Sequence, residues 1–378
     1  MLIKPNAGQP ARIKVIGVGG GGGNAISSMM SEGGIAGVEF VAVNTDAQAL
    51  LHNRAAIKVQ IGEGVTKGLG SGGDPEIGRQ AAEESRERIK EELAGCDMVF
   101  ITCGEGGGTG TGAAPIVAEI AKESGALTIA VVTKPFDFEG SRRKNSATDG
   151  IQKLKEKVDT LIVVPNQKIL QVVDRKTPVL EAFRKIDSVL HQGVKGVAEL
   201  ITVPGLINVD FADVRTIMSN AGTALMGVGV GTGDKRALAA IKMAISSPLL
   251  DTSIEGAKGV LFNVMGGPDL TMAEIDEAAM LITKSVDPDA DIIFGAVIDD
   301  QMVDQIKVTI VATKFDENKL KMFNFRKSSE LLEEKETTFS KVENIKQLAE
   351  DDVVELSDSD SIADDENEFD IPAFLRKK

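Results

Sequence analysis

The sequence predicts an α/β fold: a parallel-sheet, Rossmann-like first domain, a long central helix, a smaller α/β second domain and a disordered acidic tail. Two stretches of the first half predict the sheet, because each runs from a short apolar strand through glycines into a helix. They cover residues 13–30 and 98–118. Apolar residues at helical spacing between Pro178 and Ile201 predict the long helix. Such an alternation of strands and helices is typical of a parallel sheet.

The composition limits the class of protein. The chain has 378 residues and a formal net charge of −15, which argues against a general nucleic-acid binder, because such proteins carry basic surfaces. Two cysteines and two histidines leave little from which to build a disulfide framework, a zinc site or a Ser-His-Asp site. We see no N-terminal signal segment and no apolar run of about 18 residues. We therefore expect a cytoplasmic protein that meets membranes only indirectly.

A glycine-rich loop from Gly104 to Gly112 lies between an apolar strand, Met98 to Cys103, and a helix that begins near Ala113. Glycines let backbone N–H groups approach an anion closely, and a helix N-terminus favours phosphate. A flexible linker is the alternative, but linkers rarely separate a buried strand from a helix. No Gly-Lys-Ser/Thr follows, which excludes a P-loop. The loop predicts a phosphate site of another kind.

A second glycine loop, residues 19–24, follows the short strand Ile13 to Val18. Together with Gly17 it would satisfy the dinucleotide fingerprint GxGxxG, and Asp46 could then hold a ribose. A NAD-dependent oxidoreductase of Rossmann type therefore stays open at this point.

A third glycine loop, residues 67–74, precedes a helix that we expect to run from Pro75 to Leu93, because proline suits the first helical position. Three glycine loops in one domain are unusual for an oxidoreductase. They are natural where backbone wraps one phosphate chain from several sides.

The loop at 104–112 resembles the signature loop of the tubulin/FtsZ family, Gly-Gly-Gly-Thr-Gly-Ser/Thr-Gly. Its flanks, Cys103-Gly104-Glu105 and Ala113-Ala114-Pro115, are most similar to the FtsZ branch of that family. The resemblance implies a Rossmann-like GTPase domain whose loops surround GTP or GDP. The matching positions in the three loops are Gly20, Gly21, Gly22, Gly23, Asn24, Ser71, Gly72, Gly73, Gly107, Gly108, Thr109, Gly110 and Thr111.

Residues 134–140 also match the family, and the match implies that Glu139 and Arg143 contact the ribose and the nucleotide. Without the resemblance they would be a solvated i,i+4 pair. Asn166, which follows the strand at 161–164, matches a further contact. The next residue is usually acidic in the family, whereas this chain has a glutamine there.

Asp187 stands among the apolar residues of the predicted central helix. A carboxylate can accept from N1–H and N2–H₂ of guanine together, and an unpaired buried polar group costs about 1–3 kcal/mol, so one such residue can select the base. The alternative is a carboxylate on the one wet edge of the helix. The resemblance implies that Asp187 recognises guanine and that Phe183 packs on the base.

Asn208, Asp210 and Asp213 are an amide and two carboxylates in an apolar segment, suited to holding a water or a Mg²⁺-bound water. Helix capping is the alternative. They follow the central helix, whose about 24 residues separate them from the nucleotide loops by about 35 Å. If they are catalytic, they must serve the nucleotide of the next molecule, and subunits then stack head to tail. The segment also matches the synergy loop of the family.

Residues 221–233 are rich in glycine and small residues, and we interpret them as a domain boundary. Beyond them we expect a helix at 235–246 and strands at 259–265, 292–297 and 306–312. Thr271 and Glu274 form a capping box before another helix. This half contains no catalytic constellation of its own, and the resemblance implies that it serves mainly the subunit contact.

The C-terminal tail has two parts. Residues 350–370 contain eleven acidic residues and no basic one, which predicts disorder. Ile371, Phe374 and Leu375, followed by three basic residues, are typical of a short recognition peptide. A plain charged tail is the alternative. The resemblance implies that this peptide binds membrane-anchoring and regulatory division proteins.

Together with these observations, the resemblance implies a GTP-dependent polymerising cytoskeletal GTPase that organises the bacterial division (Z) ring at midcell, with GTP hydrolysed in the presence of Mg²⁺ at the subunit interface. The alternatives are the oxidoreductase and a non-hydrolysing, nucleotide-stabilised scaffold. The expected segments are a flexible N-terminus (1–11), a GTP-binding domain (12–177), the central helix (178–203), a synergy-loop segment (204–222), a C-terminal α/β domain (223–315), a disordered acidic linker (316–368) and the recognition peptide (369–378).

Overall fold

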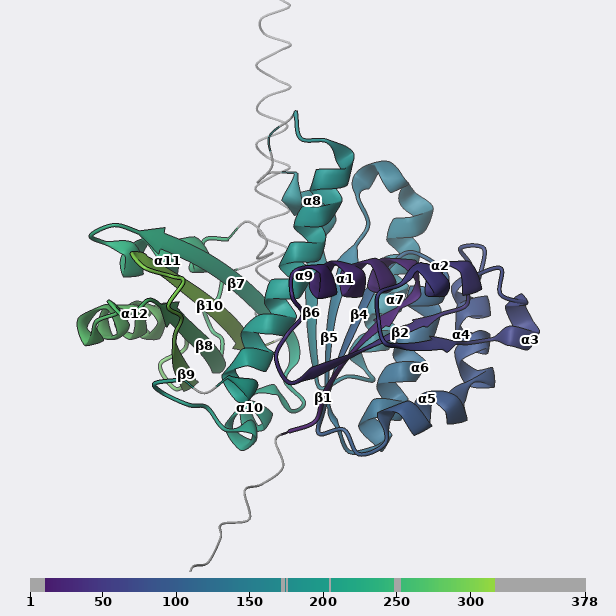
Figure 1. Ribbon diagram of the computed structural model, residues 1–378, viewed down its shortest axis with the longest axis horizontal. Coiled ribbons are helices and arrows are strands. Elements are labelled where there is room, and N and C mark those ends of the chain that lie inside the picture. Colours follow the sequence, from purple (N-terminus) through teal and green to yellow (C-terminus); the bar gives the residue numbers. More distant parts are fainter. Residues whose placement is uncertain (1–10, 171–173, 175, 204, 248–252, 317–378) are drawn as a thin grey trace, which may run out of the picture. The chain divides into compact units, whose positions relative to one another are not determined.

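The computed structural model describes residues 11–170, 174, 176–203, 205–247 and 253–316 (Figure 1). All of them belong to one compact unit, Met1–Lys321. The recognition peptide and all but the first residue of the predicted acidic linker lie outside the described residues.

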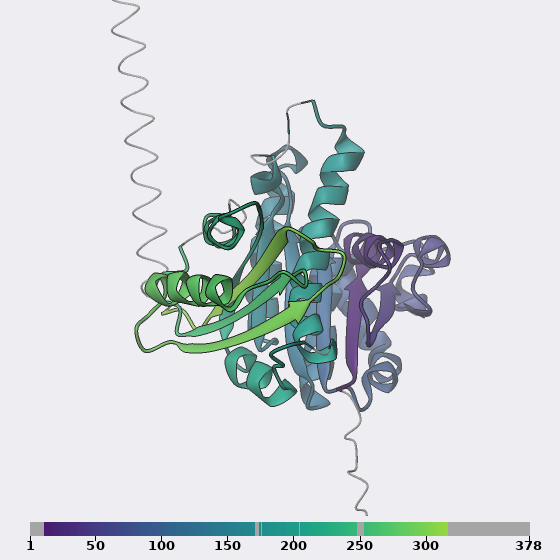
Figure 2. The same ribbon diagram turned by 60° about the vertical axis from the view of Figure 1, so that its left-hand side comes forward.

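Ten strands form one sheet in the order β3-β2-β1-β4-β5-β6-β7-β10-β8-β9 (Figure 1, Figure 2). The strands β1 to β6 are parallel, in the order 3-2-1-4-5-6 that is typical of dinucleotide- and nucleotide-binding folds. The predicted α/β fold class is therefore confirmed. The strands are β1 Ile13–Val18, β2 Val38–Asn44, β3 Ile57–Gln60, β4 Met98–Gly104, β5 Leu127–Lys134, β6 Thr160–Pro165, β7 Gly222–Thr232, β8 Gly259–Gly266, β9 Asp291–Ile298 and β10 Gln305–Thr313.

Helices cover both faces of the parallel part, as its strands require, because they are apolar on both sides. On one face, α1 and the long α9 pack over side chains such as Val15 and Phe100. On the other face, α4, α5 and α6 pack over Ile16 and Ile101. The helices of this half are α1 Gly19–Ser31, α2 Ala47–His52, α3 Glu63–Thr66, α4 Pro75–Glu84, α5 Arg86–Leu93, α6 Thr109–Glu123, η1 Asp137–Glu139, α7 Ser141–Lys155, α8 Asn166–Ile169 and α9 Val179–Thr202.

The single helix expected from Pro75 to Leu93 is wrong, because the structure has two helices that meet at Ser85. Ser85 has φ −103° and ψ 16°, outside helical geometry. Its hydroxyl accepts a hydrogen bond of 3.0 Å from the Gly62 N–H. This bond ties the junction of α4 and α5 to Gly62, the N-cap of α3.

The glycine-rich segment at 221–233, which we interpreted as a domain boundary, contains the strand β7, and its pairing places it inside the ten-stranded sheet. β7 is parallel to β6 on one side and antiparallel to β10 on the other. Its glycines serve packing: an added Cβ at Gly227, Gly229 or Gly231 would come within 2.0 Å of a backbone oxygen of the adjacent helix α11. Only glycine allows α11 to lie so close to the strand.

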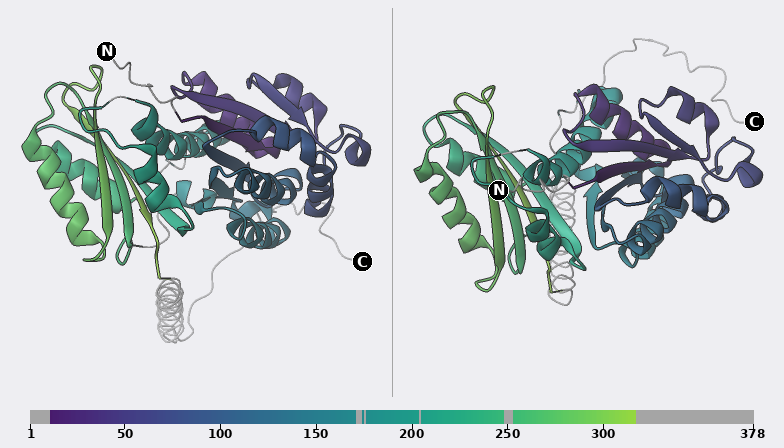
Figure 3. Two further views of the ribbon diagram at one scale, coloured as in Figure 1. Left: turned by 90° about the horizontal axis from the view of Figure 1, so that it is seen from below. Right: turned by 60° about the horizontal axis from the view of Figure 1, so that its bottom comes forward.

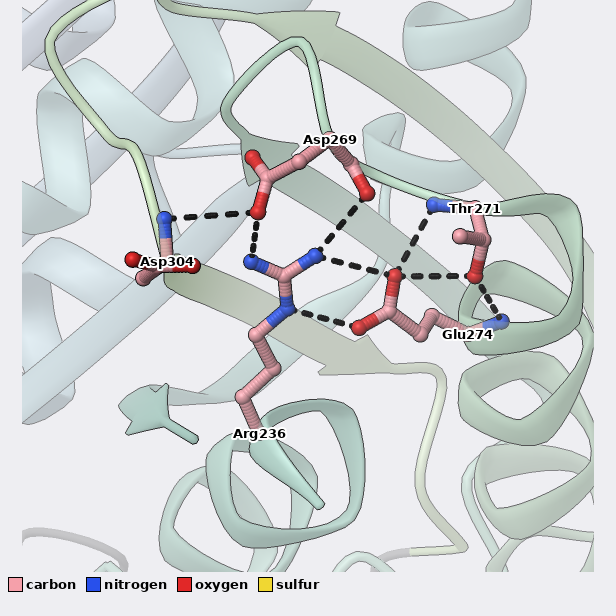
Figure 4. A network of polar contacts seen from close by, with 5 residues as sticks. All are labelled: Arg236, Asp269, Thr271, Glu274 and Asp304. Carbon is pink, nitrogen blue, oxygen red and sulfur yellow. Dashed lines mark hydrogen bonds and ion pairs between the residues drawn. The ribbon is translucent and has the colours of Figure 1, made fainter. Parts of the chain in front are cut away.

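The second half continues the sheet with α10 Phe211–Met218, α11 Arg236–Ile245 and α12 Met272–Ser285. One face of its strands joins the core beneath α9, and the other packs against α11 and α12, as Figure 3 shows for the green α12. The predicted capping box of Thr271 and Glu274 is confirmed. Figure 4 shows that Arg236, only 7% exposed, extends from α11 to the carboxylates of Asp269 and Glu274.

Candidate functional site

A cavity with a volume of about 980 Å³, the main cavity below, lies at the carboxyl ends of the parallel strands. This edge of an open α/β sheet is where ligands bind in such folds. The volume is at the upper end of the range for small-molecule sites, about 300–1,000 Å³. The lining includes Gly21, Asn24, Ser27, Ser28, Glu32 and Arg54 from the N-terminal segment, Gly104, Glu105, Gly107, Thr133, Pro135, Glu139, Arg143 and Asn166 after later strands, and Leu180, Phe183, Arg184 and Asp187 on α9.

The second glycine loop, residues 19–24, is the beginning of α1, which starts at Gly19 directly after β1. Gly21 and Asn24 line the main cavity. Gly20 and Gly23 line a smaller cavity that shares Asn24. Packing requires a glycine at position 22, because an added Cβ on Gly22 would lie 2.3 Å from the Thr102 carbonyl oxygen of β4. The glycines thus bring a helix N-terminus against the sheet at the cavity.

The loop at 104–112 leads straight into α6, which begins at Thr109 rather than near Ala113. A helix start buried without a capping side chain leaves N–H groups available to an anion. The Thr109 hydroxyl lies 2.7 Å from the Thr45 hydroxyl and 2.9 Å from that of Ser71. The Thr109 side chain therefore links this loop to Thr45, which follows β2, and to Ser71 in the third glycine loop.

Thr111 and its neighbours shape the loop itself. The Thr111 hydroxyl accepts a 2.8 Å hydrogen bond from the Gly106 N–H. An added Cβ at Gly108 or Gly110 would lie 2.3 to 2.8 Å from atoms of the third loop or of Gly104. Gly107 lines the main cavity. The loop is thus held by hydroxyls and close backbone contacts, and it exposes Gly107 to the cavity.

The third glycine loop, residues 67–74, lies beside the loop at 104–112 but does not line the main cavity. Ser71 is buried against Thr109. Gly72 and Gly73 have φ of 60° and 79°, a left-handed conformation that favours glycine, with no atom near an added Cβ. The structure thus places Ser71 beside the loop and leaves the two glycines at an open turn.

Glu139 and Arg143 form the ion pair expected from their spacing, and both also line the cavity. Glu139 is held further by the Phe136 N–H, which donates to its Oε1 at 2.9 Å. Asn166 lines the cavity and is buried, and its Oδ1 has no hydrogen-bond partner among the described residues. A buried acceptor without a partner at a cavity wall is suited to a ligand donor.

The helix α9 forms the far wall of the cavity. Phe183 is 43% exposed there and meets the Phe136 ring edge-on at 5.6 Å between centroids. Burial, with a smaller effect of the Glu32 carboxylate, raises the pKa of Asp187 to about 6. The structure therefore brings an exposed ring and a half-buried carboxyl to one end of the cavity, the arrangement predicted for base recognition.

Two acidic residues of the cavity escaped the sequence analysis. Glu105, within the signature loop, is 4% exposed, and burial raises its pKa to about 7. Glu32, at the end of α1, lies 2.6 Å from the His191 ring. Glu105 could have been noticed in the sequence, because it stands between two glycines of the signature loop. Nothing local pairs Glu32 with a histidine 159 positions away.

Asn208, Asp210 and Asp213 are not brought to the cavity. They are exposed and follow the opposite end of α9, whose 24 residues span about 36 Å. Asp210 is the N-cap of α10, and its Oδ1 accepts from the Asp213 N–H at 2.8 Å. Asn208 Oδ1 accepts from the Gly205 N–H at 2.6 Å. The capping interpretation thus applies to Asp210, whereas the Asp213 carboxylate faces solvent.

Comparison with known proteins identifies the family. The model of the tubulin/FtsZ family GTPase domain matches residues 12–174, and that of the FtsZ family C-terminal domain matches residues 222–316. An empty FtsZ dimer from M. jannaschii is 50% identical, with a TM-score of 0.77, and the match covers 81% of this chain and 88% of that one. The chain belongs to the FtsZ family.

Other FtsZ-family and related structures agree with this assignment. A point mutant of M. jannaschii FtsZ is also 50% identical, with a TM-score of 0.77 over 80% of this chain and 91% of that one. CetZ2 from Haloferax volcanii, a GTPγS-bound protofilament, shares the fold at 21% identity, with a TM-score of 0.69 over 86% of this chain and 99% of that one.

Family membership indicates the ligand class of the chain. This FtsZ-family chain is a tubulin-like GTPase that binds GTP and GDP, which leaves the oxidoreductase alternative without support. Within the described residues, no group of three or more His, Cys, Asp or Glu could hold a metal ion. None of the helices in the described part of the chain combines the length and the apolar character that a membrane span requires.

Proposed function

We propose that this chain hydrolyses GTP only as part of a filament, in which one subunit binds the nucleotide and the next supplies Asp210 and Asp213. The observation that carries the proposal is the distance between the two groups. The cavity is lined by the first half of α9, up to Leu190, whereas these carboxylates follow the other end of the helix, which is about 36 Å long. A heterologous contact between the two ends stacks subunits head to tail.

The base end of the cavity supports guanine as the base. Asp187 offers a carboxylate that accepts from N1–H and N2–H₂, and Phe183 offers a ring face for stacking. Glu139, Arg143 and Asn166 line the cavity where ribose and phosphates would lie. The glycine loops present the N-termini of α1 and α6 to the phosphates.

Asp210 and Asp213 would act on water. One oxygen of Asp210 caps α10, while the Asp213 carboxylate is exposed and can accept a hydrogen bond from a water molecule. That water attacks the γ-phosphorus, the bond to the β–γ bridging oxygen breaks, and GDP and phosphate leave. Asn208, whose side chain holds the Gly205 N–H, positions the segment.

Mg²⁺ fits this site only as a companion of the nucleotide. The described residues contain no cage of acidic ligands, and Mg²⁺ at nucleotide sites is bound largely by phosphate oxygens and waters. When bound, it would neutralise charge on the phosphates. The residues of this chain hold the nucleotide and orient the water.

We place the filament at the division ring, in the cytoplasm at midcell. The FtsZ-family C-terminal domain and the solved FtsZ dimer support a cell-division role. The tail peptide, residues 369–378, would bind membrane-anchoring and regulatory division proteins, so that contact with the membrane is indirect.

The decisive experiment measures phosphate release from GTP with Mg²⁺ over a range of protein concentrations, alongside pelleting of polymer. We expect the rate per molecule to rise from near zero above a threshold at which polymer also appears. A constant rate per molecule without polymer would show that the site is complete within one chain. Polymer that forms with GTP but releases no phosphate would favour the nucleotide-stabilised scaffold, in which Asp210 serves only as the α10 cap.

A further inference from the structure

Glu105 is a carboxyl group built into the phosphate loop. Its neighbours Gly104 and Gly107 line the main cavity, and its own backbone N–H donates to the Thr133 carbonyl oxygen at 3.0 Å. The side chain is buried, with 4% of the residue exposed. Glu105 is thus fixed at the loop that receives the phosphates, without being solvated.

The surroundings of the Glu105 side chain contain no compensating cation among the described residues. The Cys103 thiol of β4 donates to Oε1 at 3.3 Å, and Oε2 is buried without a hydrogen-bond partner. The Thr111 hydroxyl of α6 lies close enough to lower the pKa of Glu105, as the Cys103 thiol does, but both effects are smaller than that of burial. Gly150 of α7 faces the carboxyl group, and an added Cβ there would lie 2.4 Å from Oε2. A buried carboxylate normally requires a paired charge or several donors.

Phosphate binding would make an ionised Glu105 still less favourable. An anion at the loop repels an ionised Glu105 through a medium of low dielectric constant, where charges interact strongly. A protonated carboxyl avoids both the burial cost and the repulsion, and its O–H can donate from the oxygen that now lacks a partner.

We propose that Glu105 is the proton-carrying group of the phosphate loop: it is neutral in the nucleotide-bound protein, and guanine-nucleotide binding takes up a proton there. The inference rests on the proposed nucleotide site. Glu105 acts as a positioning residue, because its neutral form lets Gly104 to Gly107 close on the phosphates without a competing charge.

The pH range of the effect follows from the groups around Glu105. Burial raises the pKa of Glu105 to about 7 in the absence of nucleotide, and a neighbouring phosphate raises it further. Cys103 stays protonated, because burial raises its pKa well above the usual range. The other residues that face Glu105 do not titrate. Above pH 7 the unliganded protein loses this proton and the complex keeps it, so affinity falls by about tenfold per pH unit until the bound form titrates.

The test measures GDP binding to the full chain by titration calorimetry from pH 7 to 9, in two buffers of different ionisation enthalpy. This range lies above the titrations of Asp187 and of the terminal phosphate. Glu105→Gln is the variant, with Glu105→Met as a second neutral side chain of similar length. Glu119→Gln is the matched control, because Glu119 on α6 lies outside the cavity and pairs with Lys157 at 2.7 Å.

Wild type and Glu119→Gln should take up a proton on binding GDP near pH 8, and both should bind about tenfold more weakly at pH 8.5 than at pH 7.5. Glu105→Gln or Glu105→Met should take up none, and its affinity should match or exceed that of wild type at pH 8.5. Proton uptake that persists in the neutral variants, or none in wild type, overturns this inference alone. A wild-type protein that binds no GDP at any pH overturns the proposed function as well.

Discussion

The Nδ1 atom of His191 lies 2.6 Å from Oε2 of Glu32, where α9 packs against α1 beside the main cavity. His191 is buried and its Nε2 has no partner among the described residues, whereas Glu32 is half exposed and lines the cavity. The histidine therefore fixes a second carboxylate beside Asp187, whose pKa this charge helps to raise.

Replacing Glu32 with glutamine should shift the pH dependence of guanine-nucleotide binding. The change keeps the side-chain size and removes the charge, so the pKa of Asp187 falls and its carboxylate stays ionised to lower pH. GDP affinity measured between pH 5 and 7 should therefore decline at a lower pH than in wild type. An unchanged midpoint would show that Glu32 does not act on Asp187. Replacing exposed Glu39 on β2 with glutamine provides the control.

Asp187→Asn should abolish the decline in GDP affinity that we expect for wild type between pH 7 and pH 5. The ionised carboxylate accepts from both guanine donors, and protonation near pH 6 replaces one acceptor with a donor. Wild-type affinity for GDP should thus fall as pH drops below about 6, while the variant binds weakly at every pH. We expect a loss of about tenfold or more at pH 7, from about 1–3 kcal/mol for an unpaired donor. Equal affinity for GDP and ADP in wild type would contradict this role.

Two substitutions at Asp210 separate capping from catalysis. Asparagine is as good an N-cap as aspartate, so Asp210→Asn should retain the stability of α10, whereas Asp210→Ala should cost about 1 kcal/mol. If Asp210 serves the neighbouring subunit's nucleotide, both variants should lose about 100-fold in GTP turnover while GDP binding is unchanged. Phosphate release and chemical denaturation measure the two effects. An Asp210→Asn protein with wild-type turnover would leave capping as its whole role.

The Arg236 network should stabilise the second half in a pH-dependent manner. Hydrogen bonds lower the pKa of Glu274 to about 2, chiefly the bond from Arg236 and to a smaller extent those with Thr271 (Figure 4). A lowered pKa gives stability that is present above the usual glutamate value and is lost as pH falls from about 4.5 towards 2. Arg236→Met should lower the free energy of unfolding by about 2 kcal/mol at pH 7, since it leaves two partly exposed carboxylates without their cation.

The control for Arg236→Met is Arg79→Met, which breaks an ion pair between two exposed side chains on α4. Exposed pairs contribute little, so this variant should unfold like wild type. Denaturant midpoints for both variants at pH 7 and pH 4 give the comparison. Equal losses at the two sites would mean that burial of Arg236 adds nothing.

Gly229→Ala should prevent or severely weaken folding. The added Cβ would stand 1.9 Å from the Ala240 carbonyl oxygen of α11, a backbone atom that cannot move without displacing the helix. Overpacking of this kind costs about 3 kcal/mol. Gly20→Ala is the control for folding, because no atom lies within 4 Å of its Cβ. Thermal unfolding should separate the two, and a soluble Gly229→Ala protein with wild-type stability would refute the packing argument.

The sequence was informative where the cause of structure is local. Apolar runs predicted the strands, and the glycine loops between strand and helix indicated an anion site at their ends. Predictions of helix starts were less accurate for a physical reason. The helix α1 begins with five glycines, which disfavour a helix, yet Gly22 is required because β4 approaches its Cα too closely for a Cβ. Tertiary packing overrides propensity at that point.

The features that escaped prediction depend on contacts distant in sequence. Burial of Glu105 requires α7 to pack over the loop through Gly150. The sequence pattern of residues 104–112 does not predict this burial. The strand β7 depends on pairing partners from both halves. Similar glycine content therefore describes a loop at one place and a close-packed strand at another.

The unequal pairing of β7 sets where this sheet is mechanically weakest. Residues 222–224 pair with β6 in three register positions, whereas the strand pairs with β10 in eight. Torsion between the two halves would strain the shorter ladder first, and β7 would travel with β10. A subunit strained by its neighbours would thus separate first between β6 and β7, and the core that the two halves share beneath α9 would resist that separation.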